Sequence, residues 1–296
     1  MEKSKVYFTR TITKEKVLEL YDKLGLDLTA DGENQVAAKV HSGEKGNQNF
    51  LRPDFWAPII KKLHATVVEC NTAYSGARNT TEAHLATLKE HGWDRLPLDL
   101  MDATGPDLEI PIENGKILKK NILGKNIANY DSMIVLSHFK GHPMGGFGGA
   151  LKQLSIGCAS TAGKCWIHSG GQITDQAILW EHTADQDVFL ESMADAASSV
   201  VKLFENRIAF INVMANMSVD CDCCATAEDP CMQDIGILAS LDPIAIDQAC
   251  LDLVKNSDDE GRDHLVERIT SRHGEHTLEA AAELGFGSRD YELIEL

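Results

Sequence analysis

The sequence predicts an α/β protein with mixed, largely parallel sheets in a two-lobed arrangement with a cleft between the lobes. Short apolar runs of strand length alternate with segments of helical periodicity, which is typical of this fold class. The 296 residues, 43% of them hydrophobic, are enough to bury a sizeable core. We expect a larger α/β lobe over residues 1–205 and a smaller one over residues 206–296.

The expected elements follow one another from the N-terminus. Strands are expected at residues 6–9, 36–40, 66–70, 132–136, 208–213, 235–239 and 291–294. Helices are expected at residues 13–24, 52–63, in a segment ending at 91, and at 189–203, 243–254 and 277–284. Thr13 is the expected cap of the first helix, and Pro53 lies at the start of the second. The Asn114-Gly115 turn predicts a hairpin between residues 108–112 and 116–120.

Composition and charge exclude some functional classes. The net charge of −17 argues against nucleic-acid binding, because phosphate contacts need a basic face. No segment has the roughly 18 apolar residues of a membrane span, and the N-terminus has no signal-peptide pattern. We therefore expect a cytoplasmic protein without a membrane partner. In that reducing compartment, the eight cysteines are expected to be metal ligands, catalytic groups or core residues rather than disulfides.

The segment from Ser137 to Lys152 is the first candidate site. It holds five glycines, two histidines and two lysines directly after an expected strand. Glycine lets the backbone approach a ligand closely, and amides at the start of a helix cradle anions. The alternative is a tight strand-to-helix turn with solvated lysines, since the spacing fits neither a dinucleotide nor a P-loop motif. The candidate catalytic residues are His142 and Lys152, and the candidate cofactor-binding residues are Gly145, Gly146, Gly148, Gly149 and Lys152.

The cysteine cluster is the second candidate site. Cys221, Cys223 and Cys224 follow the expected strand at 208–213, and Cys231 lies seven residues further on. A loop can direct such closely spaced thiolates at one metal, and thiolates favour zinc, copper(I), nickel or the iron of an iron–sulfur cluster. The spacing matches neither a zinc ribbon nor a ferredoxin. The alternative is a group of partly buried, inert thiols.

Several motifs together resemble the domain-of-unknown-function (DUF) family numbered 362, whose uncharacterised members often carry ferredoxin modules. They are the runs from Ser137 to His142, Gly148 to Lys152, Asp220 to Cys223, Asp234 to Ser240 and Asp242 to Asp247, with similar segments from His41 to Gly46, from Asn71 to Arg78 and at the C-terminal end. The segment after His168 lacks the Cys-x₂-Cys-x₂-Cys insert of many members. We therefore expect no built-in ferredoxin, and a separate ferredoxin-type electron donor is a candidate partner.

A more distant resemblance is to the nickel-pincer lactate racemases. The run from His142 to Lys152 is similar to their His-Pro-x-Ala-Gly-x-Ser-Gly-Gly-x-Lys stretch. The resemblance implies that Lys152 carries the pincer cofactor, that His168 binds the metal and that His142 acts in acid–base catalysis. The segment from Ser75 to Arg78 has alanine where the racemases place a second catalytic histidine. This difference argues against racemase activity itself, because inversion of a centre needs two acid–base groups.

These features favour a metal- or iron–sulfur-dependent enzyme, an oxidoreductase or an isomerase-like protein of the kind found in anaerobes. It would carry out redox or hydride and proton transfer on a small oxygenated substrate. The expected metal ligands are Cys221, Cys223, Cys224 and His168. The expected cofactor is a transition metal or an iron–sulfur cluster, and a nickel-pincer nucleotide is the form that the racemase resemblance implies.

Two alternatives come from other functional classes. The first is a non-catalytic iron–sulfur electron carrier or a metal-cofactor binding protein. The second is a nucleotide-binding enzyme with structural cysteines, in which the Gly-rich segment binds phosphate. The presence of His142, Lys152 and His168 favours the metal-dependent enzyme, because an electron carrier has no use for these side chains.

Overall fold

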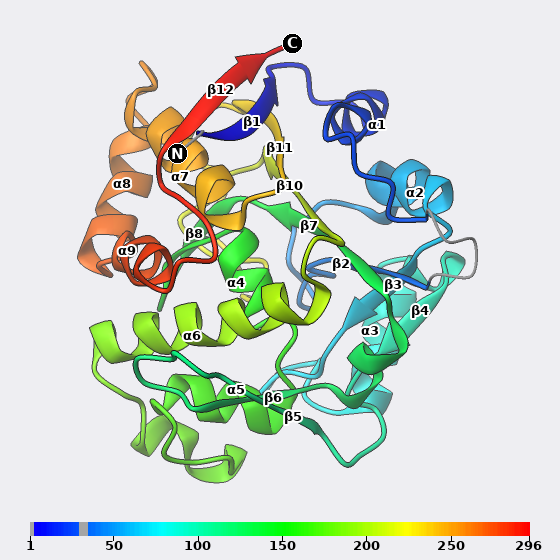
Figure 1. Cartoon of the computed structure of the whole chain (residues 1–296), viewed down its shortest axis with the longest axis vertical. Helices are drawn as coiled ribbons and strands as arrows, with labels where there is room; N and C mark the ends of the chain where they lie inside the picture. Colours follow the sequence, from blue (N-terminus) through cyan, green and yellow to red (C-terminus); the bar gives the residue numbers. More distant parts are fainter. Residues whose placement is uncertain (1–2, 30–34) are drawn as a thin grey trace.

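One eight-stranded sheet forms the centre of the computed structural model, which describes residues 3–29 and 35–296 (Figure 1). Its strands lie in the order β12-β1-β11-β10-β7-β2-β3-β4. Their bounds are Ser4–Thr9 (β1), Val36–Lys39 (β2), Thr66–Glu69 (β3), Leu98–Leu100 (β4), Ser132–His138 (β7), Ile208–Met214 (β10), Gly236–Ser240 (β11) and Tyr291–Glu295 (β12). Only β11 runs against its neighbours in this sheet. The predicted mixed, largely parallel α/β fold is therefore confirmed.

Two hairpins stand outside the large sheet in the described part of the chain. They pair β5 (Leu108–Pro111) with β6 (Lys120–Leu123) and β8 (Lys140–His142) with β9 (Gly146–Gly148). The α-helices are α1 (Lys14–Lys23), α2 (Pro53–Lys62), α3 (Thr81–Glu90), α4 (Ala150–Leu154), α5 (Thr161–His168), α6 (Gln186–Phe204), α7 (Pro243–Lys255), α8 (Arg262–Ser271) and α9 (His276–Glu283). Short 3₁₀ helices span Trp93–Arg95, Lys125–Asn129 and Gln176–Glu181.

Helices cover both faces of the large sheet (Figure 1). Trp56 of α2 belongs to the core on one face, together with side chains of α1 and α3. Leu151 of α4 belongs to the core on the other face, together with side chains of α6 and α7. Within β7, Ile134 points to the first core and Val135 to the second, because successive strand residues point to opposite faces. The result is a three-layer arrangement with a sheet buried on both sides.

The predicted hairpin between residues 108–112 and 116–120 is wrong in its second strand. Leu108 lies opposite Leu123, so β5 pairs with residues 120–123. The backbone N–H groups of Lys116, Ile117 and Leu118 instead donate to the buried carboxylate of Asp195 at 2.7–2.8 Å. This carboxylate on α6 holds the segment after Asn114-Gly115 as a loop. The other strands and helices expected from periodicity are present, with ends shifted by a few residues.

Strands from both expected lobes lie in the same sheet. β10 and β11, from the range 206–296, lie between β1 and β7, from the range 1–205. The division near residue 205 and the cleft between lobes stay predictions, as does the cytoplasmic location. None of the helices in residues 3–29 and 35–296 is both long and apolar enough to span a membrane.

Candidate active site at the carboxyl edge of the sheet

Four parallel strands bring their carboxyl ends to one edge of the sheet. β2, β3, β7 and β10 pair in parallel, and the segments that follow such strands form the crevice where ligands bind. His41 lies two residues after the end of β2, Glu69 ends β3 and His138 ends β7. The loop that carries Cys221 and Cys223 follows β10. Residues far apart in the sequence therefore meet at this edge.

A pocket of about 200 Å³ lies among these segments. It is lined by the predicted residues His142, Lys152 and His168 together with Cys223 from the cysteine loop. The structure thus brings the Gly-rich segment and the cysteine cluster to one place. Their roles in catalysis and binding stay predictions.

Cys221 and Cys223 place their sulfurs beside two imidazole rings, those of half-buried His41 and buried His142. Cys221 Sγ lies 3.8 Å from His41 Nε2, and Cys223 Sγ lies 3.8 Å from His142 Nε2. Ligand atoms of His142, Cys221 and Cys223 all lie within 4.8 Å of one another. A tetrahedral ion with ordinary zinc bond lengths separates a sulfur and a nitrogen ligand by about 3.6 Å. The spacing therefore suits a single metal ion.

Hydrogen bonds to the backbone decide which nitrogen of these two rings carries the proton. His41 Nδ1 accepts the N–H of Gly43 at 3.2 Å, and His142 Nδ1 accepts those of Met144 and Gly145 at 3.1 and 2.8 Å. Burial lowers the pKa of both rings to about 4, so both are neutral at pH 7. A neutral ring that accepts at Nδ1 carries its proton on Nε2. Both histidines therefore direct an N–H at a cysteine sulfur.

Asp222, between the two cysteines, anchors their loop. Its carboxylate is 1% exposed and lies 2.9 Å from both His138 Nδ1 and Lys140 Nζ. His138 Nε2 lies 2.6 Å from the carbonyl oxygen of Ala215, so both ring nitrogens face acceptors and both carry protons. Burial opposes ionisation of Asp222, but His138 and Lys140 outweigh it and hold the pKa of the carboxyl well below its usual range. The loop is thereby tied to β7 and β8.

The thiols of the cluster have different surroundings. Contact with Cys221 lowers the pKa of the Cys223 thiol, but contact with Cys224 and burial outweigh it and raise the pKa to about 11. Contact with Cys223 lowers the pKa of the half-buried Cys224 thiol. Cys231 donates to the carbonyl of Met217 at 3.3 Å and does not line the pocket. A metal ion at Cys223 must therefore displace a proton.

His168 has the opposite tautomer to His41 and His142. Its Nδ1 lies 2.7 Å from the carbonyl oxygen of Lys164, so Nδ1 carries the proton and Nε2 keeps its lone pair. The ring stacks on Phe189 with centroids 4.8 Å apart, and burial lowers its pKa to about 4. Among the described residues, the group with metal-ligand spacing contains His142 and neither His168 nor Cys224.

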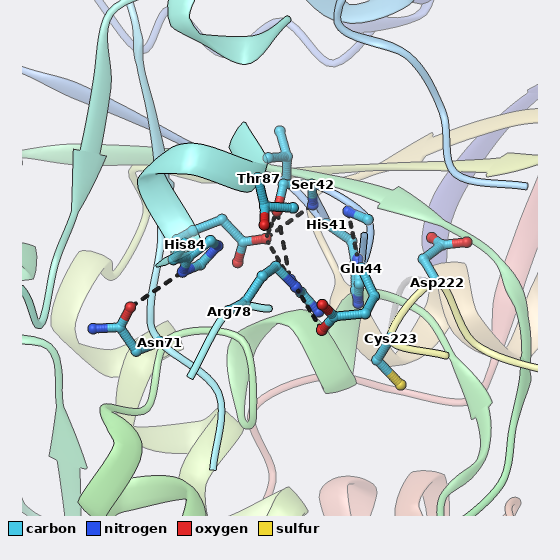
Figure 2. Close-up of polar contacts among 12 residues, drawn as sticks. His41, Ser42, Glu44, Asn71, Arg78, His84, Thr87, Asp222 and Cys223 are labelled. Atoms are coloured by element: carbon cyan, nitrogen blue, oxygen red, sulfur yellow. Dashed lines mark hydrogen bonds and ion pairs between the residues drawn. The ribbon is translucent and has the colours of Figure 1, made fainter. Parts of the chain in front are cut away.

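A buried ion-pair network forms the adjoining wall of the site. Arg78 lies 3.3 Å from Glu44 and 3.5 Å from Glu69, and Lys39 lies 2.7 Å from Glu69. Figure 2 shows Arg78 directed at Glu44. Burial opposes ionisation of Glu69, but Lys39 and Arg78 outweigh it and lower the pKa of the carboxyl. These charges are therefore neutralised mainly by one another.

The start of α4 already has an internal anion. The N–H groups of Ala150 and Leu151 donate to the carboxylate of Asp247 on α7, at 2.8 and 2.9 Å. A Cβ on Gly149 would lie 2.3 Å from Asp247 Oδ1, so only glycine lets this carboxylate approach. The expected anion cradle at the start of this helix is thus occupied by the protein itself.

The other glycines of the segment differ in what they permit. The segment folds as the β8–β9 hairpin rather than as a simple turn. A Cβ on Gly146 would lie 2.8 Å from Gly274 Cα, so this glycine lets the hairpin pack on the α8–α9 connection. Gly145 lies at the His142 ring, and Gly148 faces the pocket, with Lys140 the nearest neighbour of a Cβ at 3.5 Å. Their predicted cofactor-binding role stays a prediction.

Sequence reasoning missed several residues of the site. His41, Asp222 and Lys164 were not among the predicted site residues. His41 lies in a motif shared with the DUF family and closely follows a strand, which is the signal that could have found it. The signals for Asp222 and Lys164 are weaker, because charged residues are common after strands and on helices.

The fold and the site together define a class: a three-layer α/β protein with a thiol–imidazole pocket at the carboxyl edge of its sheet. Within that class, the chain belongs to the family described as Domain of unknown function (DUF362), whose model matches residues 36–252. The matched region contains both the Gly-rich segment and the cysteine loop. The family resemblance of the motifs is therefore confirmed. No curated protein matches the sequence.

Two solved structures are similar at low sequence identity. The lactate racemase apoprotein from Thermoanaerobacterium thermosaccharolyticum is 14% identical, with a TM-score of 0.43, over 70% of this chain and 50% of that one. A protein from Thermotoga maritima is 13% identical, with a TM-score of 0.41, over 92% of this chain and 59% of that one. The matches thus span between half and three fifths of the length of these proteins. At these values the similarity concerns the arrangement of elements alone.

Proposed function

We propose that this protein is a metal-dependent enzyme that transfers protons or hydride to or from a small oxygenated substrate. The observation that carries the proposal is that Cys223 and three neutral histidines line one pocket, with Cys221 at metal-ligand spacing from Cys223 and His142. Cys221 and Cys223 would hold the ion as thiolates, because soft metal ions prefer sulfur. A bound ion would supply Lewis-acid polarisation of a substrate oxygen.

The two N–H groups directed at the sulfurs favour thiolate ligation. His41 and His142 each donate toward one sulfur, and hydrogen bonds around a ligand tune and orient it. To become a metal ligand, His142 would have to lose the proton on Nε2, because its Nδ1 already accepts two backbone N–H groups. Cys224, whose side chain contacts Cys223, is the predicted alternative for a third ligand, although it lies outside the group with metal-ligand spacing.

Opposite tautomers on one pocket suit proton transfer. The lone pair on His168 Nε2 accepts a proton, whereas His142 Nε2 carries one. Both rings are neutral and line the pocket, so His168 would act as a base, and His142, whose Nε2 proton otherwise faces Cys223, would act as an acid. The geometry therefore supports His142 in acid–base catalysis and gives His168 a base role beside its predicted metal-ligand role.

Lys152 and His168 are the residues that would hold a nickel-pincer nucleotide. Their chemistry fits, because no hydrogen bond or ion pair within the described ranges involves Lys152 Nζ and His168 keeps a lone pair. The volume does not fit. The pocket of about 200 Å³ is smaller than the ~300–1,000 Å³ of sites for drug-sized ligands, and a nucleotide and a substrate need more room. The pocket suits one small molecule beside a metal ion.

Metal analysis of the protein purified without oxygen tests the proposal. The wild type should carry a stoichiometric metal, and the double variant Cys221→Ser/Cys223→Ser should lose it. Cys231→Ser, which changes a half-buried thiol of the same segment, should keep it. Unchanged metal content in the double variant would contradict the proposed site. A broad visible absorption typical of an iron–sulfur cluster, without any turnover of substrate, would favour the electron carrier instead.

A further inference from the structure

We infer that the pocket recognises its substrate by an oxyanion, a carboxylate or phosphate group, held between Lys152 and Lys164. This inference deepens the proposed function by naming the substrate class of the same pocket. Binding of the anion by two lysines requires no metal, so its failure and the failure of the metal site are distinguishable.

The lining of the pocket holds more cationic than anionic side chains, in a chain of net charge −17. Five lysine and arginine side chains line it against one carboxylate, that of Glu69. An excess of positive charge at a partly enclosed site concentrates anions from solution. The five cations are Lys39, Arg78, Lys140, Lys152 and Lys164.

Three of the five cations are already paired with buried carboxylates. Lys39 and Arg78 share Glu69, Arg78 also contacts Glu44, and Lys140 lies 2.9 Å from Asp222. An incoming anion would have to compete with these carboxylates. These three cations are therefore part of the structure of the site rather than its free charges.

Lys152 and Lys164 have no carboxylate partner in the described part of the chain. Lys164 is 6% exposed, and its Nζ donates only to the carbonyl of Ala159, at 2.6 Å. The Asp102 carboxylate interacts electrostatically with Lys164. That carboxylate accepts the N–H groups of Asn71 and Thr161, however, and forms no ion pair with Lys164. A buried ammonium group without a counter-charge costs free energy, which an anion at this position would offset.

The two lysines are placed so that a bound anion presents the rest of its molecule to the histidines. The charge of Lys152 acts on His142, His168 and Cys223. Lys164 lies one helical turn before His168 on α5, and its carbonyl binds the His168 ring. A substrate anchored by its oxyanion would therefore place its neighbouring atoms beside the proposed acid and base.

Calorimetric titration of the protein as purified tests this inference with three probes: propionate, inorganic phosphate and the neutral isostere propionamide. We expect propionate or phosphate to bind and propionamide not to bind. Binding of propionate alone identifies a carboxylate site, and binding of phosphate alone identifies a phosphate site. Lys152→Met and Lys164→Met should each weaken binding by about tenfold or more, because each removes a charged hydrogen-bond donor.

Lys202→Met, which changes an exposed lysine on α6, is the matched control and should bind as the wild type does. Lys152→Arg should retain anion binding, because arginine keeps the positive charge. If Lys164→Met fails to fold, the comparison of Lys152→Met with Lys152→Arg tests the inference by itself. The inference is overturned if neither anion binds the wild type, or if the methionine variants bind as tightly as it does. Metal content measured on the same samples shows separately whether the thiol site is intact.

Discussion

Proton positions on single residues determine what this site can do. The rings of His41 and His142 carry the same tautomer because backbone N–H groups occupy Nδ1, whereas a carbonyl oxygen at His168 Nδ1 produces the other. His138 faces two acceptors and carries both protons. Four histidines in one small region therefore have three proton arrangements, each set by the immediate partners of the ring.

Replacing Asp222 by asparagine should destabilise the protein strongly at neutral pH. The change leaves the buried charges of His138 and Lys140 without a carboxylate, which costs about 3–5 kcal/mol of unfolding free energy. The folded pKa of Asp222 is depressed, so its contribution is present above the unfolded pKa of about 4 and is lost as pH falls through the folded pKa. Urea unfolding should thus show a loss at about pH 5 that is no smaller than the loss at pH 7.

The control for this change is Asp258→Asn, since Asp258 is exposed and its replacement should leave the unfolding free energy unchanged at either pH. A difference between wild type and Asp222→Asn that already shrinks on going from pH 7 to pH 5 would mean that Asp222 is not held ionised by its two partners.

At the scale of elements, the β8–β9 hairpin and α4 are held by close packing with segments distant in sequence. A Cβ on Gly141 would lie 2.2 Å from the carbonyl oxygen of Val219, directly before the cysteine loop. On the other side, α4 begins on the carboxylate of Asp247, whose pKa burial raises to about 6. Gly141 thus lets the hairpin lie against the segment before the cysteine loop, and Gly149 lets the start of α4 lie against α7.

Two neighbouring glycines should respond differently to alanine. Gly149→Ala would force the Asp247 carboxylate away from the start of α4, and losing these hydrogen bonds should cost about 1–3 kcal/mol of stability. A Cβ at position 148 would have no neighbour nearer than 3.5 Å, so Gly148→Ala should have a melting temperature close to that of the wild type. Thermal melts of both variants, followed by circular dichroism, measure the difference. Equal losses in the two would contradict the packing role of Gly149.

At the scale of the whole molecule, one sheet connects the two ends of the chain. β1 lies between β11 and β12, and β10 separates β11 from β7. A range ending at residue 205 would leave β7 without its neighbour β10, and β1 without both of its partners. The shared sheet therefore favours one cooperative unit over two independent lobes.

Differential scanning calorimetry distinguishes these two arrangements. We expect a single transition whose calorimetric and van't Hoff enthalpies agree, because unfolding either range removes sheet partners from the other. Two resolved transitions, or a fragment of residues 1–205 that melts cooperatively by itself, would support the two-lobed division instead.

The sequence by itself determined the class of the fold and the meeting of the two motifs. Hydrophobic periodicity is a local property, so the strands at 132–138 and 208–214 and most helices are readable from neighbouring residues. Because parallel strands end at one edge of a sheet, the segments after these strands were also bound to meet. The hairpin at 108–123 was misread because its loop is held by Asp195, far along the chain.

Only the tertiary structure decided the chemistry of the site. Cys221 and its donor His41 are 180 positions apart, and His138 and Asp222 are 84 apart. No local pattern encodes which acceptor a histidine ring nitrogen meets. Nor does one encode that the Asp247 carboxylate accepts the N–H groups at the start of α4, or that Lys164 has no carboxylate partner among the described residues. Protonation and pairing of buried groups depend on burial and on the few atoms within hydrogen-bond distance, and both arise only when distant segments pack together.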